Sequence, residues 1–162
     1  TPEFLGKKIE AKEMKIAMIV ALFHPFLILA GTALTAYLPE FGTKTLNNPG
    51  FHGFSEMLYE FTSSSANNGS GFEGLGDNTP WWNISTGIVL LLSRFIPIIG
   101  PIAIAGCLAE KKFIPEGSGT LKTDTLTFGF MTLAVIILIA ALSFFPSLTL
   151  GPIAEQLQYF SK

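Results

Sequence analysis

Three long stretches almost without charge constrain this chain more than any other feature of its sequence. They cover residues 16–38, 84–109 and 126–145. A helix needs about 20 mostly apolar residues to cross the hydrocarbon core of a bilayer, and each stretch reaches that length. Arg94 is the one charged residue inside them. We therefore expect an all-α integral membrane protein with three transmembrane helices.

The overall composition agrees with that class and excludes others. Charged residues make up 14% of the 162 residues, compared with about 25% in ordinary soluble domains. The net charge of -2 provides no basic surface for nucleic acid. A single cysteine, Cys107, excludes an internal disulfide. His24 has no Cys, Asp or Glu at ligand spacing, so we expect it to be packed or hydrogen-bonded, without a metal.

Basic residues gather at one end of the three stretches. Those that precede the first stretch or lie between the second and third are Lys7, Lys8, Lys12, Lys15, Lys111, Lys112 and Lys122. In membrane proteins, an excess of Lys and Arg in the loops marks the cytoplasmic side. We therefore expect a cytoplasmic amino end, three crossings and an external carboxyl end.

A shorter helix is predicted between the first two stretches, over residues 54–65. Its apolar residues fall at helical spacing, and Ser55 is suited to cap its start. A helix of this length reaches roughly 16 to 18 Å, about half the membrane. Glu56 and Glu60 lie four residues apart on one face. They either attract cations toward an external vestibule or are ordinary surface carboxylates.

Residues 66–71 follow this helix with almost no side-chain bulk. Potassium filters replace the water around the ion with backbone carbonyls, and Gly69 permits the unusual dihedrals that such a segment needs. Irregular backbone at membrane depth is tolerated only where protein or water covers it. The order of span, half helix, glycine-containing segment and span therefore predicts a re-entrant pore loop. From the residues alone, an external turn is equally compatible, because Asn and Gly are common in turns.

The region that starts at Gly69 contains a match to a nucleotide-binding motif and two tryptophans of a kind that is common at membrane interfaces. Residues 69–74 match the GxGxxG pattern of dinucleotide-binding loops. That fingerprint needs a strand before it, whereas a helix is expected here, so we expect no nucleotide site. The chain also lacks a P-loop and a phosphorylation segment, and we expect no catalytic residue and no organic cofactor. Trp81 and Trp82 are predicted to lie in an interfacial aromatic belt.

Several segments together resemble a known family. They are the leader (residues 1–10), residues 54–56, 67–72, 94–95 and 97–99, and the tail (residues 149–155). Over nearly its whole length the chain resembles the carboxyl-terminal portion of the A subunit (KdpA) of bacterial Kdp potassium-transporting ATPases. That portion comprises a cytoplasmic connector, the fourth span–pore–span repeat and the last helix.

The resemblance implies a channel-like subunit that binds potassium and moves it across the bacterial inner membrane. Asn67, Asn68 and Gly69 match the family's selectivity filter, where backbone carbonyls hold the ion, and Ser70 lies at its outer edge. Potassium is then a substrate and the only metal involved. The implied partners are a P-type ATPase subunit that hydrolyses ATP, small accessory subunits, three further repeats of the same subunit, and lipid.

The expected segments follow from the stretches and the resemblance together. They are a cytoplasmic connector (1–15), the repeat (16–109) with its pore helix (54–65) and filter (66–71), a cytoplasmic loop (110–125), the last transmembrane helix (126–150) and an external tail (151–162).

Two questions stay open at the level of sequence. Arg94 lies inside the second span, where a cation costs about 2.5 to 3.5 kcal/mol, so it must face protein or water. It either borders the ion pathway below the filter or clamps carbonyls of a neighbouring repeat. The rival functions are a stand-alone potassium channel or Trk-type symporter subunit, and a non-conducting membrane assembly subunit.

Overall fold

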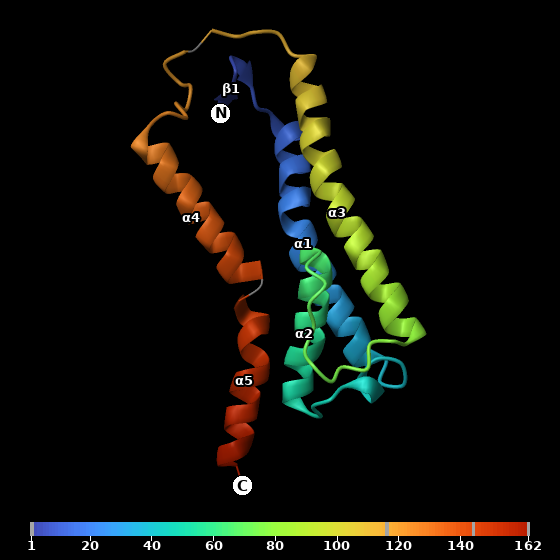
Figure 1. The fold of residues 1–162 in the computed structure, drawn as a ribbon. Helices are drawn as coiled ribbons and strands as arrows, with labels where there is room; N and C mark the ends of the chain where they lie inside the picture. Colours follow the sequence, from blue (N-terminus) through green and yellow to red (C-terminus); the bar gives the residue numbers. More distant parts are fainter. Residues whose placement is uncertain (1, 116, 144, 162) are drawn as a thin grey trace.

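The computed structural model describes residues 2–115, 117–143 and 145–161. Its elements, drawn in Figure 1, are β1 (Glu3–Phe4), β2 (Lys7–Lys8), α1 (Ala11–Tyr37), the short 3-10 turn η1 (Thr43–Thr45), α2 (Phe51–Ala66), α3 (Pro80–Ala109), α4 (Leu126–Ser143) and α5 (Phe145–Phe160). Helices α1, α3 and α4 are long and apolar enough to cross a membrane. The expected all-α membrane architecture is confirmed, with one two-stranded antiparallel hairpin added near the amino end.

Helices α1 and α3 run antiparallel and pack side by side (Figure 1). Their 27 and 30 residues correspond to about 40 and 45 Å. Both helices begin a few residues before the nearly uncharged stretches of the sequence. The side chain of Thr79 accepts a hydrogen bond from the Trp82 amide, which caps α3, and Pro80 occupies its first turn, where a missing N–H costs nothing.

The close contact between α1 and α3 depends on a residue without a side chain. A Cβ atom at Gly100 would lie 2.3 Å from Cγ2 of Val20, far inside van der Waals distance. Pro25 lies inside α1, and Pro97 and Pro101 lie inside α3. Both helices continue through them, as membrane helices commonly do.

Helix α2 (Phe51–Ala66) is the short helix that the sequence predicts, and it begins three residues earlier and ends one residue later than expected. Its 16 residues reach about 24 Å, less than the roughly 30 Å of a bilayer core. It begins at Phe51, and the residue at its cap is Gly50, whose φ of 73° lies in the left-handed region that glycine adopts freely. The prediction that Ser55 caps this helix is therefore wrong. Ser55 lies one turn inside and faces Gly151 of α5.

Helix α2 enters and leaves on one side of the structure. In Figure 1 it starts at the end where α1 finishes, and the chain after it returns along α2 to the start of α3. The core that holds it in place joins three helices: Leu27 and Ile28 of α1, Met57, Leu58 and Phe61 of α2, and Trp82 and Val89 of α3. This arrangement is a re-entrant helix wedged between two spans.

Phe61 lies at the centre of that core and is 0% exposed. A Cβ atom at Gly31 of α1 would lie 2.5 Å from Cδ1 of Phe61. The ring therefore packs directly against the backbone of α1 at this glycine. Trp82, 5.6 Å from Phe61 between ring centroids, is 1% exposed, and its Nε1 donates to Oγ1 of Thr45 at 2.8 Å. The expectation that Trp82 lies in an interfacial belt is wrong, because the inserted α2 gives its ring a protein surface to pack on. Trp81 is partly buried and donates to Thr35.

The carboxyl-terminal part forms two helices. Helix α4 has no buried residue, and α5 packs against α2. A Cβ atom at Gly151 would lie 2.3 Å from Oγ of Ser55, so this glycine permits the close contact between α5 and α2. The region expected to be a tail is helical as far as Phe160. Pro146 lies in the first turn of α5, a position that proline tolerates, and α5 continues through Pro152.

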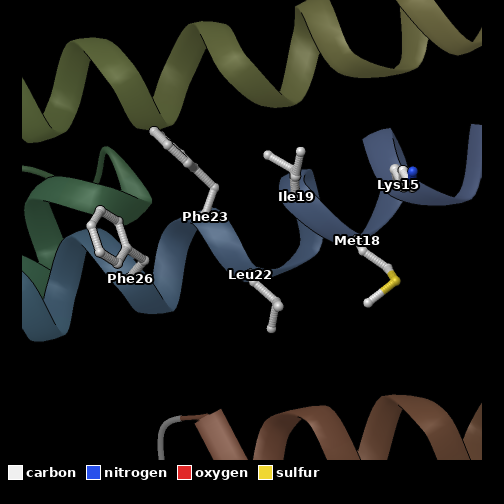
Figure 2. Close-up of a pocket in the computed structure, with 6 residues that line it drawn as sticks. All are labelled: Lys15, Met18, Ile19, Leu22, Phe23 and Phe26. Atoms are coloured by element: carbon white, nitrogen blue, oxygen red, sulfur yellow. The ribbon is translucent and has the colours of Figure 1, made fainter. Parts of the chain in front are cut away.

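An open apolar groove of about 580 Å³ runs along α1. It is lined by Lys15, Met18, Ile19, Leu22, Phe23 and Phe26 (Figure 2). Met18 and Leu22 point away from α3 in that view. Because hydrocarbon cannot replace the water around an ion, this groove does not qualify as an ion site.

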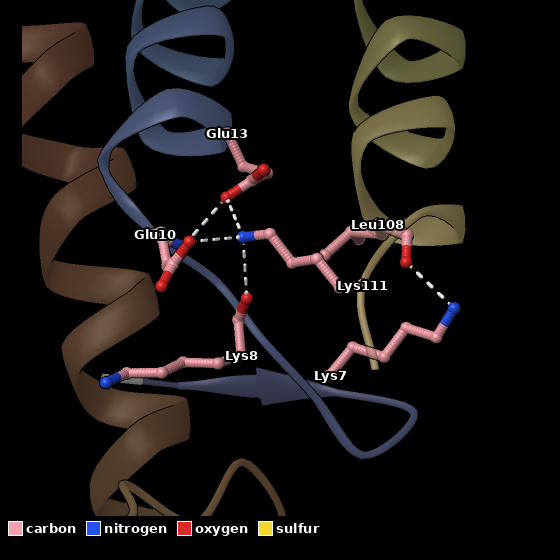
Figure 3. A network of polar contacts seen from close by, with 6 residues as sticks. All are labelled: Lys7, Lys8, Glu10, Glu13, Leu108 and Lys111. Carbon is pink, nitrogen blue, oxygen red and sulfur yellow. Dashed lines mark hydrogen bonds and ion pairs between the residues drawn. The ribbon is translucent and has the colours of Figure 1, made fainter. Parts of the chain in front are cut away.

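A polar cluster ties the amino-terminal hairpin to the start of α1 and the end of α3 (Figure 3). Nζ of Lys111, just after α3, lies 2.7 Å from Oε2 of Glu13 and 3.0 Å from Oε2 of Glu10. It also donates to the carbonyl of Lys8 at 3.0 Å. The hydrogen bond from Lys111 to Glu13 is the main reason that the pKa of Lys111 is raised above its ordinary value.

Lys7 extends the same cluster to the end of α3. Its Nζ donates to the carbonyls of Leu108 and Ala109 at 2.8 and 3.2 Å. These are among the last carbonyls of the helix, which have no partner inside it, and a cation there is stabilised by the helix dipole. The start of α1 and the end of α3 are thereby held together at one end of the structure.

Candidate functional site

The candidate site begins where α2 ends. Asn67 has φ 59° and ψ 35°, the left-handed conformation that Asn adopts more readily than most residues. The N–H of Asn67 donates to the carbonyl of Ser64, and that of Asn68 to the carbonyl of Ser63, both at 3.1 Å. This pair of bonds is the Schellman arrangement that satisfies the last carbonyls of a helix. The chain turns out of α2 at Asn67 because Asn is tolerated there.

The same bonds fix the direction of two carbonyls. Among the described residues every peptide bond is trans, and in a planar trans peptide the C=O and N–H groups point in opposite directions. Since the N–H groups of Asn67 and Asn68 point back into α2, the carbonyls of Ala66 and Asn67 point away from its body. They add to the partial negative charge at the carboxyl end of the helix.

Gly69 continues the segment with a φ of 70°. Nothing lies within 4 Å of where its Cβ would be, so no neighbour excludes a side chain. Its backbone conformation, which L side chains rarely adopt, is what requires glycine.

Ser70 is fastened back to α2. Its N–H donates to Oγ of Ser63 at 2.9 Å, and the two hydroxyl oxygens also lie 2.9 Å apart. The hydroxyl of Tyr59 lies 3.2 Å from Oγ of Ser70. Ser63 and Tyr59 are absent from the sequence predictions. Three consecutive serines follow Thr62, and only the return of the loop along α2 shows which one it meets.

Arg94 of α3 reaches the same segment. Its Nε donates to Oδ1 of Asn67 at 2.7 Å, and Nδ2 of Asn67 donates to the carbonyl of Ser65 at 3.1 Å. The Asn67 amide therefore bridges the end of α2 to Arg94. The structure brings together the four expected filter residues and Arg94, and it pairs the arginine with Asn67 of the same chain.

Glu56 has a different environment from the one expected. It is 1% exposed, and its two carboxylate oxygens accept hydrogen bonds from the backbone N–H groups of Asn47 and Asn48 at 3.0 and 3.1 Å. It holds the segment before α2 in place, so both expectations, a vestibule carboxylate and a surface carboxylate, are wrong for Glu56. Glu60 is half-buried beside the loop, with Oε2 2.9 Å from where a Cβ of Gly71 would be.

His24 contacts the end of α2 from α1. Its Nδ1 lies 2.7 Å from Oγ of Ser65, which confirms the expectation of a hydrogen-bonded histidine. Within the described ranges, no group of three or more His, Cys, Asp or Glu side chains is arranged to hold a metal ion.

Sequence comparison decides the family. The family model described as "Potassium-transporting ATPase A subunit" (KdpA) matches residues 1–157. The chain belongs to the KdpA family. The resemblance seen in the filter segment, the leader and the tail is thereby confirmed.

Curated members of the KdpA family are similar along the whole chain. Proteins named "Potassium-transporting ATPase potassium-binding subunit" from Flavobacterium johnsoniae, Parabacteroides distasonis and Geobacillus kaustophilus are 70%, 67% and 57% identical to it. The matches cover 96%, 99% and 97% of this chain. They cover 29%, 29% and 28% of the relatives, so the chain spans less than a third of their length.

Proposed function

We propose that this chain supplies one potassium-selective pore loop of a channel-like subunit in an ATP-driven potassium uptake complex. The observation that carries the proposal is the end of α2, where residues 67–70 return along the helix with the N–H groups of Asn67, Asn68 and Ser70 bonded to it. Its support comes from the KdpA family and from relatives whose names describe a potassium-binding subunit.

The ion is bound by backbone oxygens in this proposal. The side-chain amide of Asn67 is already hydrogen-bonded to Arg94 and Ser65. The ligand that Asn67 offers the ion is therefore its backbone carbonyl. A potassium filter surrounds the ion with rings of such carbonyls. A single loop contributes a fraction of each ring, and three further repeats of a longer subunit supply the rest.

Arg94 borders the inner mouth of the filter in this arrangement. Its charge lies beside the carboxyl end of α2, and its Nε fixes the Asn67 side chain. A cation at that point opposes the passage of potassium, while its hydrogen bond holds the first filter residue. We therefore assign Arg94 to the ion pathway, with a positioning contribution through Asn67.

Orientation and partners follow from charge and family. The amino-terminal hairpin and the loop after α3, which carry the basic residues, lie at the same end in Figure 1. We propose that this end is cytoplasmic, that the filter opens outside, and that the bacterial inner membrane is the location. ATP hydrolysis then belongs to a P-type ATPase subunit on another chain, which acts with small accessory subunits.

The test is a substitution in the full-length subunit within its complex. Gly69→Asp forces a side chain onto a left-handed backbone and adds a carboxylate to the filter, so weaker potassium affinity and broader cation selectivity are expected. Gly119→Asp makes the same chemical change outside the spans, where the structure has open space around the glycine, and serves as the control. Potassium-stimulated ATPase activity, with Rb⁺ and Na⁺ in competition, measures both properties. Unchanged affinity and selectivity in Gly69→Asp would contradict the proposal.

A further inference from the structure

Ser63 lies behind the candidate filter and faces it from α2. It is 3% exposed. Its Oγ accepts a hydrogen bond from the N–H of Ser70 at 2.9 Å and lies 2.9 Å from the Ser70 hydroxyl. The Ser63 side chain is therefore directed at one specific peptide group of the loop, the one that joins Gly69 to Ser70.

This contact determines the direction of the Gly69 carbonyl. The carbonyl of Gly69 and the N–H of Ser70 belong to the same peptide, which is planar and trans. Because the N–H points at Ser63, the carbonyl points away from α2. The Ser63 hydroxyl thus aims the Gly69 oxygen away from α2, just as the bond from the Asn68 N–H to the Ser63 carbonyl aims the Asn67 oxygen away from it.

Little else in the structure fixes that peptide. Gly69 has a φ of 70° and nothing within 4 Å of its Cβ position. Glycine adopts both signs of φ with similar ease, so rotation of this peptide is opposed by no side chain. The Tyr59 hydroxyl, 3.2 Å from Oγ of Ser70, holds the side chain of Ser70.

We propose that Ser63 is a positioning residue for ion selection, which holds the Gly69–Ser70 peptide so that the Gly69 carbonyl faces the ion. This inference rests on the proposed function and adds a residue outside the filter itself. Selection between potassium and the slightly larger Rb⁺ depends on the placement of carbonyls, so the ratio of the two affinities is the quantity that Ser63 controls.

The test compares two adjacent serines in the full-length subunit within its complex. Ser63→Ala removes the acceptor, and loss of one neutral hydrogen bond predicts about a fivefold fall in the preference for potassium over Rb⁺. Ser64→Ala is the matched control, since Ser64 is also buried and its hydroxyl makes no hydrogen bond within the described residues. The readout is the concentration of each ion that gives half-maximal ATPase activity.

A second variant separates the hydrogen bond from packing. Ser63→Cys preserves the shape of the side chain but replaces the oxygen with a weak acceptor, so it is expected to shift the ratio in the same direction as Ser63→Ala. If the Ser63→Ala subunit fails to assemble into its complex, Ser63→Cys tests the same hydrogen bond.

The outcomes distinguish the inference from the function on which it rests. A ratio in Ser63→Ala and Ser63→Cys equal to that in Ser64→Ala would overturn the inference, provided that Gly69→Asp still weakens potassium binding. If Gly69→Asp also has no effect, the proposed filter itself is refuted, and the inference fails with it.

Discussion

Nζ of Lys111 lies 2.7 Å from Oε2 of Glu13, a carboxylate that is 2% exposed although it stands in the first turn of a membrane helix. The other oxygen of Glu13, Oε1, has no hydrogen-bond partner within the described residues. A buried carboxylate is tolerated only when it is paired, so Glu13 depends on Lys111.

Lys111→Met is therefore expected to destabilise the subunit, because it removes this cation and leaves Glu13 without its charged partner. The apparent melting temperature of the detergent-solubilised full-length subunit should fall by several degrees. Lys112→Met removes an exposed neighbouring charge and should leave the melting temperature close to that of the parent. Equal melting temperatures for the two variants would show that the pairing contributes nothing to stability.

The same pair predicts a pH dependence. The hydrogen bond to Glu13 raises the pKa of Lys111 above the ordinary 10.5. A lysine with a raised folded-state pKa contributes stability that is fully present below its unfolded pKa and is lost as the pH rises through the folded value. The melting temperature difference between the parent and Lys111→Met should thus stay constant between about pH 7 and 9 and shrink only in stronger alkali. A difference that shrinks already within that range would contradict the assignment.

Arg94→Gln tests the contact with Asn67. Loss of a hydrogen bond from a charged donor frees the Asn67 amide, and apparent potassium affinity is expected to fall about tenfold. Arg94→Lys keeps the charge without the guanidinium geometry and should give an intermediate value. Potassium-dependent transport in reconstituted vesicles provides the measurement. Normal affinity and rate combined with reduced expression would instead indicate a purely structural arginine.

The contact between Gly31 and Phe61 predicts a packing defect. Gly31→Val places branched carbons where the Phe61 ring lies 2.5 Å from the Cβ position, and α1 must then separate from α2. Overpacking of this kind costs about 1 to 3 kcal/mol or more. Gly87→Val alters a glycine of α3 with open space around it and should be tolerated. Thermal unfolding of the solubilised subunit compares the two, and equal stability would contradict the packing argument.

The three membrane-length helices and the short helix between two of them were predictable, because the thickness and low polarity of a membrane impose strict length and composition on a sequence. The environments of Ser55, Glu56 and Trp82 were not. Each depends on which surface α2 meets after it inserts: Gly50 begins the helix early, the loop amides of Asn47 and Asn48 enclose Glu56, and α2 covers Trp82. Periodicity along the chain carries no information about such contacts.

At the candidate site, the residues with left-handed backbone in the proposed filter could be singled out from the sequence, whereas the side chain that holds the loop against α2 could not. Asn67 and Gly69 stand out because left-handed backbone positions favour Asn and Gly. Ser63 does not stand out, since its contact with Ser70 arises only when seven residues of chain fold back on the helix.

The polar cluster that includes Lys7 and Lys111 has a consequence for how a longer protein can arise by duplication of this unit. It holds the first residues of α1 beside the last residues of α3, so the unit α1–α2–α3 starts and finishes on the same face of the membrane. A tandem copy of this unit, joined by a short connector on that face, would keep its orientation without an additional crossing. Repeated duplication would therefore produce parallel repeats related by an axis along the membrane normal, with every re-entrant loop open to the same side.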